Sequence, residues 1–164
     1  MADRKTELAE LRKLVDRMKV GMLTTLDGDK LRSRPLHTRE FDADGNLWFF
    51  VSASSPKVAE LDFDHGEVNL SYADPSKYDF VSISGRAMLV RDRVKMESLW
   101  TKMIEVWFPQ GIKDPDLALL QVKVESAEYW ESPGSAVVRL LAVTKALLTG
   151  DASSLGTDRK LQIN

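Results

Sequence analysis

The sequence predicts a single, mainly β domain, an antiparallel barrel with a few helices at its periphery. About six or seven short apolar segments follow one another at close spacing, and Gly- or Asp-containing turns separate most of them. Longer segments with the three- and four-residue spacing of amphipathic helices are few. Short strands joined by hairpins and interrupted by occasional helices are typical of antiparallel barrels.

Local signals place the elements of the first half of the chain. Apolar residues at three- and four-residue spacing near the N-terminus predict an amphipathic helix. Asp27-Gly28 is a strong hairpin signal, and Ser55-Pro56 is typical of a helix N-terminus. The expected elements are a helix over residues 4–19, strands over 22–26, 31–40 and 47–51, and a helix over 56–64.

The second half continues this pattern to about residue 150. Gly85 lies inside a long predicted strand and indicates a bulge or a close approach of two backbones. The expected elements are strands over 67–73 and 79–90, a helix over 93–108, strands over 117–124 and 127–130, and a helix over 137–148 that ends at Gly150. We therefore predict one domain over residues 1–150 and a polar C-terminal tail over residues 151–164.

The composition excludes several classes of protein. The chain has 164 residues, of which 43% are hydrophobic, and a net charge of -2, unlike the basic excess of general nucleic-acid binders. No apolar run approaches the ~20 residues that span a bilayer, and the charged N-terminus lacks the apolar core of a signal peptide. The absence of cysteine excludes disulfides, thiolate metal sites and a cysteine nucleophile. We expect a cytoplasmic protein that binds neither nucleic acid nor membrane.

Residues suited to catalysis or metal binding are sparse. His37 and His65 are the two histidines, and neither lies in a recognisable nucleophile motif, so no catalytic residue is assigned. Residues 42–46 resemble part of a calcium loop, but Ala53 stands where such a loop requires a glutamate. A second acidic cluster, over residues 62–67, straddles a predicted helix end. Both clusters are interpreted as turns, and no metal site is expected.

Two basic segments indicate a site for a phosphorylated, planar ligand. Arg32 and Arg34 are two residues apart on a predicted strand and therefore point to one face of the sheet. Two guanidinium groups on one face need solvent or an anion, and arginine binds phosphate in a bidentate manner. Further along, serine hydroxyls and Lys57 gather at the start of a predicted helix, where free backbone N–H groups favour anions. The alternatives are a solvated arginine face and an ordinary helix cap.

The segment over residues 99–111 is rich in aromatic and apolar side chains. Trp100, Met103 and Trp107 share one face of the predicted helix. Such residues are usually buried in a core, but a broad apolar surface on one element also marks subunit interfaces, and a tryptophan can stack on a planar ring. Core packing, a subunit interface and a ligand wall are therefore three open interpretations.

Short motifs occur in a fixed order over about residues 5–150. They are Gly21–Thr25, Ser33–Leu36, Leu47–Val51, Ser55–Lys57, Val68–Tyr72, Ser84-Gly85, Trp107–Gly111 and Glu128–Trp130. With them, the sequence resembles the general stress protein branch of the pyridoxamine 5′-phosphate oxidase-like superfamily, the FMN-binding split barrels. The resemblance implies a six-stranded, antiparallel Greek-key split barrel that forms homodimers, with FMN held in two clefts at the dimer interface.

The resemblance also implies a set of cofactor-binding residues. Ser33–Pro35 would line the flavin and help to hold its phosphate, and Ser55 and Lys57 would grip the same phosphate. Backbone groups of Phe50–Ser52 would face the edge of the isoalloxazine ring, and tryptophans of a partner subunit would cover it. Together with the charge argument, the expected set is Arg32, Ser33, Arg34, Pro35, Phe50, Val51, Ser52, Ser55, Lys57, Trp100 and Trp107.

Three functions follow from this resemblance. The first is an FMN-dependent oxidoreductase that acts on an unknown small molecule, because the flavin itself carries the hydride chemistry. The second is a non-catalytic protein that binds or sequesters flavin under stress, and the third is a relative that uses FAD, deazaflavin or haem. Arg139-Leu140 lies in a helical stretch and lacks the following proline of true pyridoxamine phosphate oxidases. Pyridoxamine phosphate oxidation itself is therefore not expected.

Overall fold

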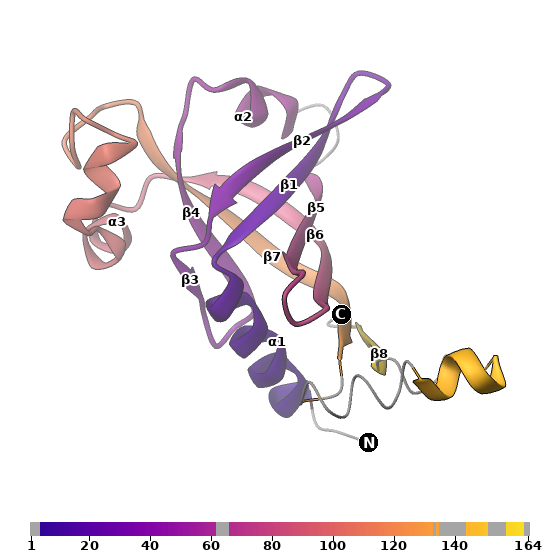
Figure 1. Cartoon of the computed structure of the whole chain (residues 1–164). Helices are drawn as coiled ribbons and strands as arrows, with labels where there is room; N and C mark the ends of the chain where they lie inside the picture. The colour runs from indigo at the N-terminus through magenta and orange to yellow at the C-terminus, as the bar shows by residue number, and fades with distance from the viewer. Residues whose placement is uncertain (1–3, 62–65, 133, 135–143, 151–156, 163–164) are drawn as a thin grey trace.

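The structure is a computed structural model that describes residues 4–61, 66–132, 134, 144–150 and 157–162 (Figure 1). No helix in these ranges is long and apolar enough to cross a membrane. The helices are α1 (Arg4–Met18), α2 (Pro56–Leu61), α3 (Arg93–Leu99) and the 3-10 helix η1 (Lys102–Val106), and residues 144–149 are also helical. The strands are β1 (Val20–Asp27), β2 (Lys30–His37), β3 (Glu40–Phe41), β4 (Asn46–Ser52), β5 (Glu67–Asp74), β6 (Asp79–Val90), β7 (Leu117–Glu131) and β8 (Thr157–Gln162).

The described strands form one antiparallel sheet in the order β2-β1-β5-β6-β7-β4-β3, with β8 paired to β7. The two ends of this order, β2 and β3, follow one another in the chain, so residues 38 and 39 join the ends of the sheet. Among the described strands, no ladder of hydrogen bonds closes the sheet into a complete barrel. The prediction of a mainly antiparallel β fold with peripheral helices is confirmed, but the sheet has eight strands where six were expected.

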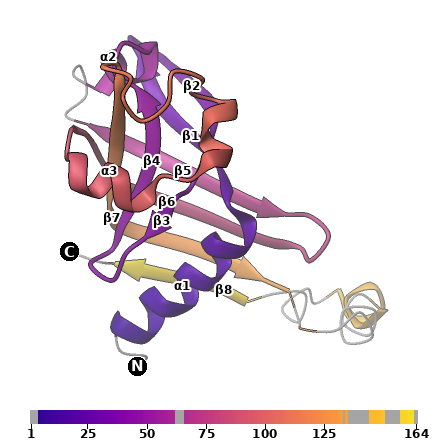
Figure 2. The same cartoon turned by 90° about the vertical axis from the view of Figure 1, so that its left-hand side faces the viewer.

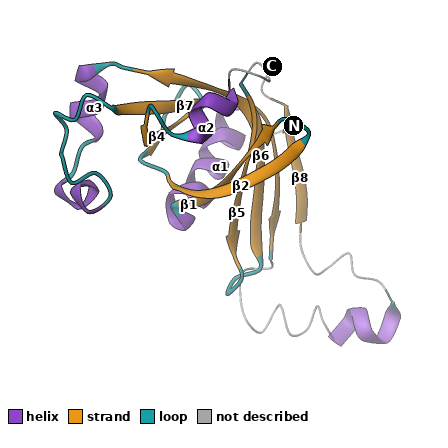
Figure 3. Ribbon diagram, turned by 90° about the horizontal axis from the view of Figure 1, so that it is seen from above, coloured by secondary structure: helices purple, strands orange, loops and turns teal. Residues whose placement is uncertain are grey.

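The main core lies on the inner face of the sheet. Side chains alternate along β1, where Leu23 and Thr25 are buried while Met22 and Thr24 are not. The apolar stripe of α1 packs into the same core, as the amphipathic pattern of the sequence predicts. Seen from above, α1 and α2 lie between β2 and β4 (Figure 3). The inner face of β2 is therefore the face that α2 can reach.

A second cluster of buried residues joins β4 and β7 to α3 and η1. In Figure 2, α3 lies in front of the end of the sheet that contains β4. The single helix predicted over residues 93–108 is wrong, because α3 ends at Leu99 and η1 begins at Lys102. Trp100 and Thr101 have extended backbones between them. This break lets the Trp100 ring meet Phe50 edge-on, with the ring centroids 5.3 Å apart.

The C-terminal strands differ from the prediction in two ways. β7 is one strand of 15 residues, where two strands were expected, because its ladder with β6 continues through a register shift at Ser84/Gly85. A Cβ atom at Gly85 would lie 2.3 Å from the carbonyl oxygen of Lys123, which confirms the predicted close approach. β8 lies in the segment expected to be a polar tail, and its Leu161 is buried in the main core. The helix predicted over residues 137–148 lies outside the described residues up to residue 143.

Candidate functional site

The strand β2 divides the predicted arginine segment between two faces of the sheet. Arg32 and Arg34 stand opposite buried residues of β1, so both arginines lie on the inner face. Ser33 and Pro35 lie on the opposite face, where the Ser33 hydroxyl is 2.6 Å from the Thr24 hydroxyl. The two arginines therefore lie on one face of the sheet, as predicted, and Ser33 and Pro35 lie on the other.

Glu60 of α2 supplies an internal anion for these arginines. Its side chain is buried, with 6% of the residue exposed. One carboxylate oxygen, Oε2, accepts hydrogen bonds from both terminal nitrogens of Arg34, each at 2.7 Å, and from the hydroxyl of Thr25. The other oxygen lies 4.0 Å from Arg32, which donates to Asp27 at 2.9 Å. The anion that the arginine pair requires is therefore provided in part by the chain itself.

The environment of Glu60 keeps its carboxylate ionised. Burial alone would raise the pKa of Glu60, but the hydrogen bonds from Thr25 and Arg34, with the charge of Arg34, outweigh burial. The pKa consequently falls below its ordinary value of 4.5. Removing one partner of a buried ion pair typically costs about 3–5 kcal/mol, because the other charge is left without compensation.

Lys57 stands three residues before Glu60 on the same short helix and is half-buried. Burial and the positive charge of Arg34 lower the pKa of Lys57, while the charge of Glu60 acts in the opposite direction. Its ammonium group makes no hydrogen bond or ion pair with any residue in the described part of the chain. A partly buried ammonium beside a guanidinium is a position where an added anion is stabilised.

The serines ahead of α2 are held by bonds within the chain. The Ser55 hydroxyl and backbone N–H both donate to the carbonyl oxygen of Ser52, at 2.6 and 3.0 Å. The backbone N–H and hydroxyl of Ser54 both donate to Asp116, at 2.9 and 2.8 Å. Since α2 has only six residues and begins with a proline, its start offers fewer free donors than the sequence indicated. Within the described part of this corner, Lys57 is therefore a group that is open to a ligand.

The structure separates the aromatic residues of the expected site. The side chains of Phe50 and Val51 are buried in the second cluster and the main core, so only their backbone groups can face a ligand. Trp100 packs against Phe50 within its own chain. Trp107, in contrast, is 76% exposed, and Met103 is 74% exposed. The core interpretation of the tryptophan segment is right for Trp100 and wrong for Trp107.

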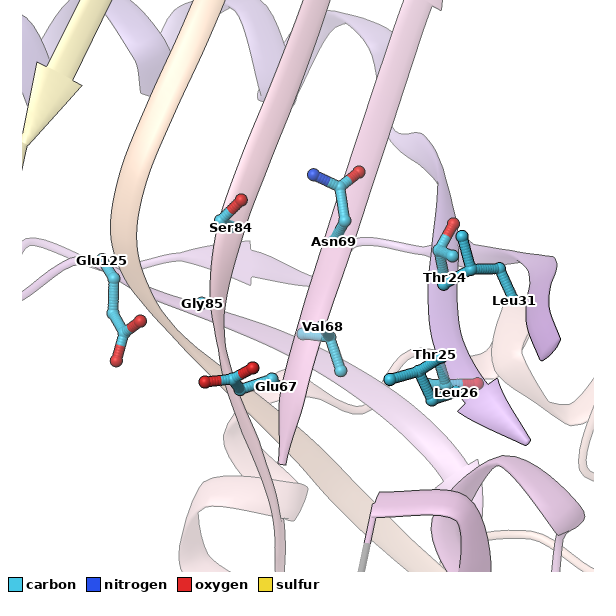
Figure 4. Close-up of a pocket in the computed structure, with 10 residues that line it drawn as sticks. All are labelled: Thr24, Thr25, Leu26, Leu31, Glu67, Val68, Asn69, Ser84, Gly85 and Glu125. Atoms are coloured by element: carbon cyan, nitrogen blue, oxygen red, sulfur yellow. The ribbon is translucent and has the colours of Figure 1, made fainter. Parts of the chain in front are cut away.

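A cavity of about 360 Å³ opens between β1 and β5 (Figure 4). The two strands pair only from Met22 to Thr24 and diverge beyond that point. Thr25 and Leu26 consequently face Glu67 and Val68 across a gap in the sheet (Figure 4). Its walls are small polar and aliphatic side chains together with the carboxylates of Glu67 and Glu125. Thr25 belongs both to this cavity and to the Glu60 cluster.

The other candidate groups from the sequence have ordinary surroundings or lie outside the description. His37 is exposed, and His65 is not among the described residues. Asp42 accepts hydrogen bonds from the backbone N–H groups of Asp44 and Asn46, at 3.0 and 2.8 Å, which confirms its interpretation as a turn. Within the described ranges, no three metal-ligating side chains gather in one place. Most of the second acidic cluster lies outside those ranges.

Sequence reasoning missed the two residues that hold Arg34, namely Glu60 and Thr25. A signal for each was present. Glu60 follows Lys57 by three residues in a predicted helix, which places both on one side of it. The hairpin at Asp27-Gly28 sets a register in which Thr25 faces Arg32. Because two neighbouring arginines require an anion, these signals together indicate Glu60 of the predicted helix as a candidate carboxylate.

The sequence as a whole decides the family. The family model described as "Pyridoxamine 5'-phosphate oxidase like" matches residues 6–154. The chain belongs to this family. The resemblance to its general stress protein branch is confirmed by solved structures of general stress proteins that are 27% and 28% identical to this chain. Protein bli-3 of Neurospora crassa is 26% identical to this pyridoxamine 5′-phosphate oxidase-like protein over 154 residues, which cover 87% of this chain and 73% of that protein.

Two solved structures illustrate the likeness of this pyridoxamine 5′-phosphate oxidase-like protein to general stress proteins. The general stress FMN/FAD binding protein of Xanthomonas citri is 28% identical, with a TM-score of 0.68, over 79% of this chain and 92% of that chain. A Clostridium acetobutylicum protein described as related to general stress protein 26 of B. subtilis is 21% identical, with a TM-score of 0.72. That match covers 99% of this chain and 97% of the other and shows the shared fold.

Proposed function

We propose that this protein binds FMN through a phosphate held by Arg34 and Lys57 and acts as an FMN-dependent oxidoreductase. The observation that carries the proposal is the half-buried Lys57 ammonium, which lies within the electrostatic influence of Arg34 and has no hydrogen-bond partner among the described residues. A phosphate suits this position because its oxygens accept charge-assisted hydrogen bonds from both cations. Among the described residues of this corner, the three cations Arg32, Arg34 and Lys57 meet the two carboxylates Asp27 and Glu60, which supports an anionic ligand.

The family supports a flavin as the ligand that carries this phosphate. The Xanthomonas citri relative is named as an FMN/FAD binding protein. The resemblance of the motifs assigns the ring edge to backbone groups of Phe50–Ser52, and the burial of the Phe50 and Val51 side chains leaves the backbone for that role. FAD contains the same riboflavin phosphate unit, so the mass of the bound cofactor distinguishes FMN from FAD.

The residues of the chain itself bind and orient the cofactor in this proposal. When bound, the flavin supplies the hydride chemistry, so no acidic or basic side chain of the protein is required for that step. Lys57 and Arg34 neutralise the phosphate, and Glu60 and Thr25 hold Arg34 in place. The absence of an assigned catalytic residue is therefore compatible with an oxidoreductase.

A second copy of the chain completes the proposed site. Met103, Val106 and Trp107 form a patch in which each residue is at least 74% exposed. Exposed apolar side chains that adjoin one another often mark an interface between subunits. In the proposed homodimer, Trp107 of one copy covers the ring held by the other, whereas Trp100 stays against its own Phe50.

The purified protein tests the proposal in two steps. The absorption spectrum and the mass of the co-purified small molecule are expected to be those of FMN, and a sample without cofactor is expected to quench FMN fluorescence on titration. Anaerobic mixing with NADH or NADPH is then expected to bleach the flavin absorption. Bound flavin that no nicotinamide or organic reductant reduces would favour the non-catalytic binding role. A protein that binds no flavin would contradict both roles.

A further inference from the structure

We propose that Glu60 is a built-in counter-ion that holds Arg34 in place and at the same time weakens the binding of phosphate at this corner. The inference rests on the proposed flavin binding, because it concerns the affinity of that same site for the cofactor's phosphate. In this inference, Glu60 tunes the affinity of the site for a phosphorylated ligand.

The geometry around Arg34 carries the first step. Both terminal nitrogens of Arg34 donate to one oxygen of Glu60, and the hydroxyl of Thr25 donates to the same oxygen. A phosphate that reaches Arg34 therefore enters the neighbourhood of a full negative charge. In a poorly solvated position this repulsion is weakly screened, because Glu60 is buried.

The placement of Lys57 carries the second step. Lys57 and Glu60 are three residues apart on α2, so one short helix delivers a cation and an anion to the inner face of β2. The anion is engaged with Arg34, and the cation makes no ion pair with the described residues. Lys57 and Arg34 consequently attract an incoming phosphate, and the carboxylate of Glu60 repels it and so weakens its binding.

Replacing Glu60 by glutamine separates the two effects of this residue. The glutamine side chain keeps an oxygen that can accept from Arg34 and Thr25, so the change removes the charge while leaving a hydrogen-bond acceptor. Without the charge, Arg34 and Lys57 repel each other in the free protein, which lowers its stability. The same loss of charge removes the repulsion felt by a phosphate, which raises the affinity. The two properties therefore change in opposite directions.

The experiment compares Glu60→Gln with Glu67→Gln in the full chain. Glu67 is exposed and lies 3.7 Å from Arg86, so its replacement makes the same change in net charge without removing a contact of Arg34. The measurements are the dissociation constants of FMN and riboflavin by fluorescence, and the melting temperature with and without inorganic phosphate. Glu60→Gln is expected to bind FMN about tenfold more tightly, to leave riboflavin binding unchanged and to melt at a lower temperature without ligand. Inorganic phosphate is expected to raise its melting temperature more than that of the wild type.

Several outcomes overturn the inference. If Glu60→Gln weakens FMN binding and lowers the melting temperature together, Glu60 has only a structural role. If Glu67→Gln changes FMN affinity by the same factor, the effect is one of overall charge. If the wild type and all variants share one FMN affinity and one phosphate-dependent rise in melting temperature, the counter-ion inference fails and flavin binding stands. If no variant binds flavin but phosphate stabilises Glu60→Gln more than the wild type, the proposed function fails and the counter-ion inference stands.

A second pair of variants keeps the test available if Glu60→Gln does not fold. The double variant Arg34→Gln/Glu60→Gln replaces the buried ion pair by two neutral amides, so neither side chain is left as an uncompensated buried charge. It is expected to bind FMN more tightly than Arg34→Gln alone, in which Glu60 is left without its guanidinium. A double variant that binds FMN no better than the single variant contradicts the inference.

Discussion

Both terminal nitrogens of Arg34 donate to the same oxygen of Glu60, each over 2.7 Å. This contact joins the edge strand β2 to the short helix α2 on the inner side of the sheet. The sequence predicts Arg34 as an arginine free to bind an anion, whereas in the structure Arg34 forms an ion pair with Glu60. The neighbouring Lys57 has no such partner in the described part of the chain. The predictions below depend on this difference between the two cations.

The first prediction concerns the pH dependence of stability. The pKa of Glu60 is lower in the folded protein than its ordinary value of 4.5, so the unfolded state takes up the proton more readily. The stabilisation by the ionised carboxylate is therefore complete above the ordinary value and is lost as the pH falls through the folded-state pKa. The free energy of unfolding in urea, measured from about pH 7 to pH 3, should fall more steeply in the wild type than in Glu60→Gln. Parallel curves for the two proteins would contradict this assignment.

The second prediction uses two adjacent threonines as a matched pair. Thr25 is buried and donates to Glu60, whereas the Thr24 hydroxyl contacts Ser33 on the exposed face. Thr25→Val is expected to cost about 1–3 kcal/mol of unfolding free energy, because a buried carboxylate loses a donor. Thr24→Val is expected to stay within about 0.5 kcal/mol of the wild type. If urea denaturation shows equal losses of unfolding free energy in the two variants, the hydrogen bond from Thr25 to Glu60 contributes no more to stability than the Thr24 contact.

The third prediction concerns Lys57. Lys57→Met removes the unpartnered cation and keeps an aliphatic side chain of similar length, so it is expected to weaken FMN binding about ten- to a hundredfold by loss of a charge-assisted contact. Lys113→Met changes the net charge equally at an exposed lysine and serves as the control. Fluorescence titration gives both dissociation constants. Unchanged affinity in Lys57→Met would place the phosphate elsewhere on the protein.

The fourth prediction distinguishes the two tryptophans. Trp100 packs edge-on against Phe50, so Trp100→Ala is expected to lower the unfolding free energy by about 3 kcal/mol. Trp107→Ala should change the stability of the isolated chain by less than about 0.5 kcal/mol, because the ring is exposed. In the proposed homodimer, Trp107→Ala instead weakens dimerisation and flavin binding together. Sedimentation over a range of protein concentrations checks the first effect, and a Trp107→Ala dimer as stable as the wild type would contradict the proposed interface.

Much of the fold could be predicted because its signals are local. Asp27-Gly28 specifies a hairpin, and Gly28 has the positive φ of 66° that such a turn requires. The apolar stripe of α1 and the close approach at Gly85 were likewise readable from single segments. The family resemblance added the split-barrel fold, to which no single segment points.

The remaining features depend on contacts between distant segments. β8 is polar along much of its length, and its strand character comes from pairing with β7 and from the burial of Leu161. The break between α3 and η1 accompanies the packing of Trp100 on Phe50, which lies 50 residues earlier in the chain. The partner of Arg34 is 26 residues away, on a different element. Local patterns indicated that the arginines need an anion but did not specify which distant segment supplies it, so the sequence predicted the cations of the site and missed Glu60.

The affinity of the wild-type protein for FMN compared with riboflavin tests the central claim most directly. The two molecules share the isoalloxazine ring and ribityl chain and differ only in the phosphate. Fluorescence titration is expected to show FMN bound at least about tenfold more tightly, equivalent to about 1.4 kcal/mol, with the difference shrinking as salt screens Lys57 and Arg34. Equal affinity for the two flavins at low salt would contradict the claim that these two residues hold a phosphate.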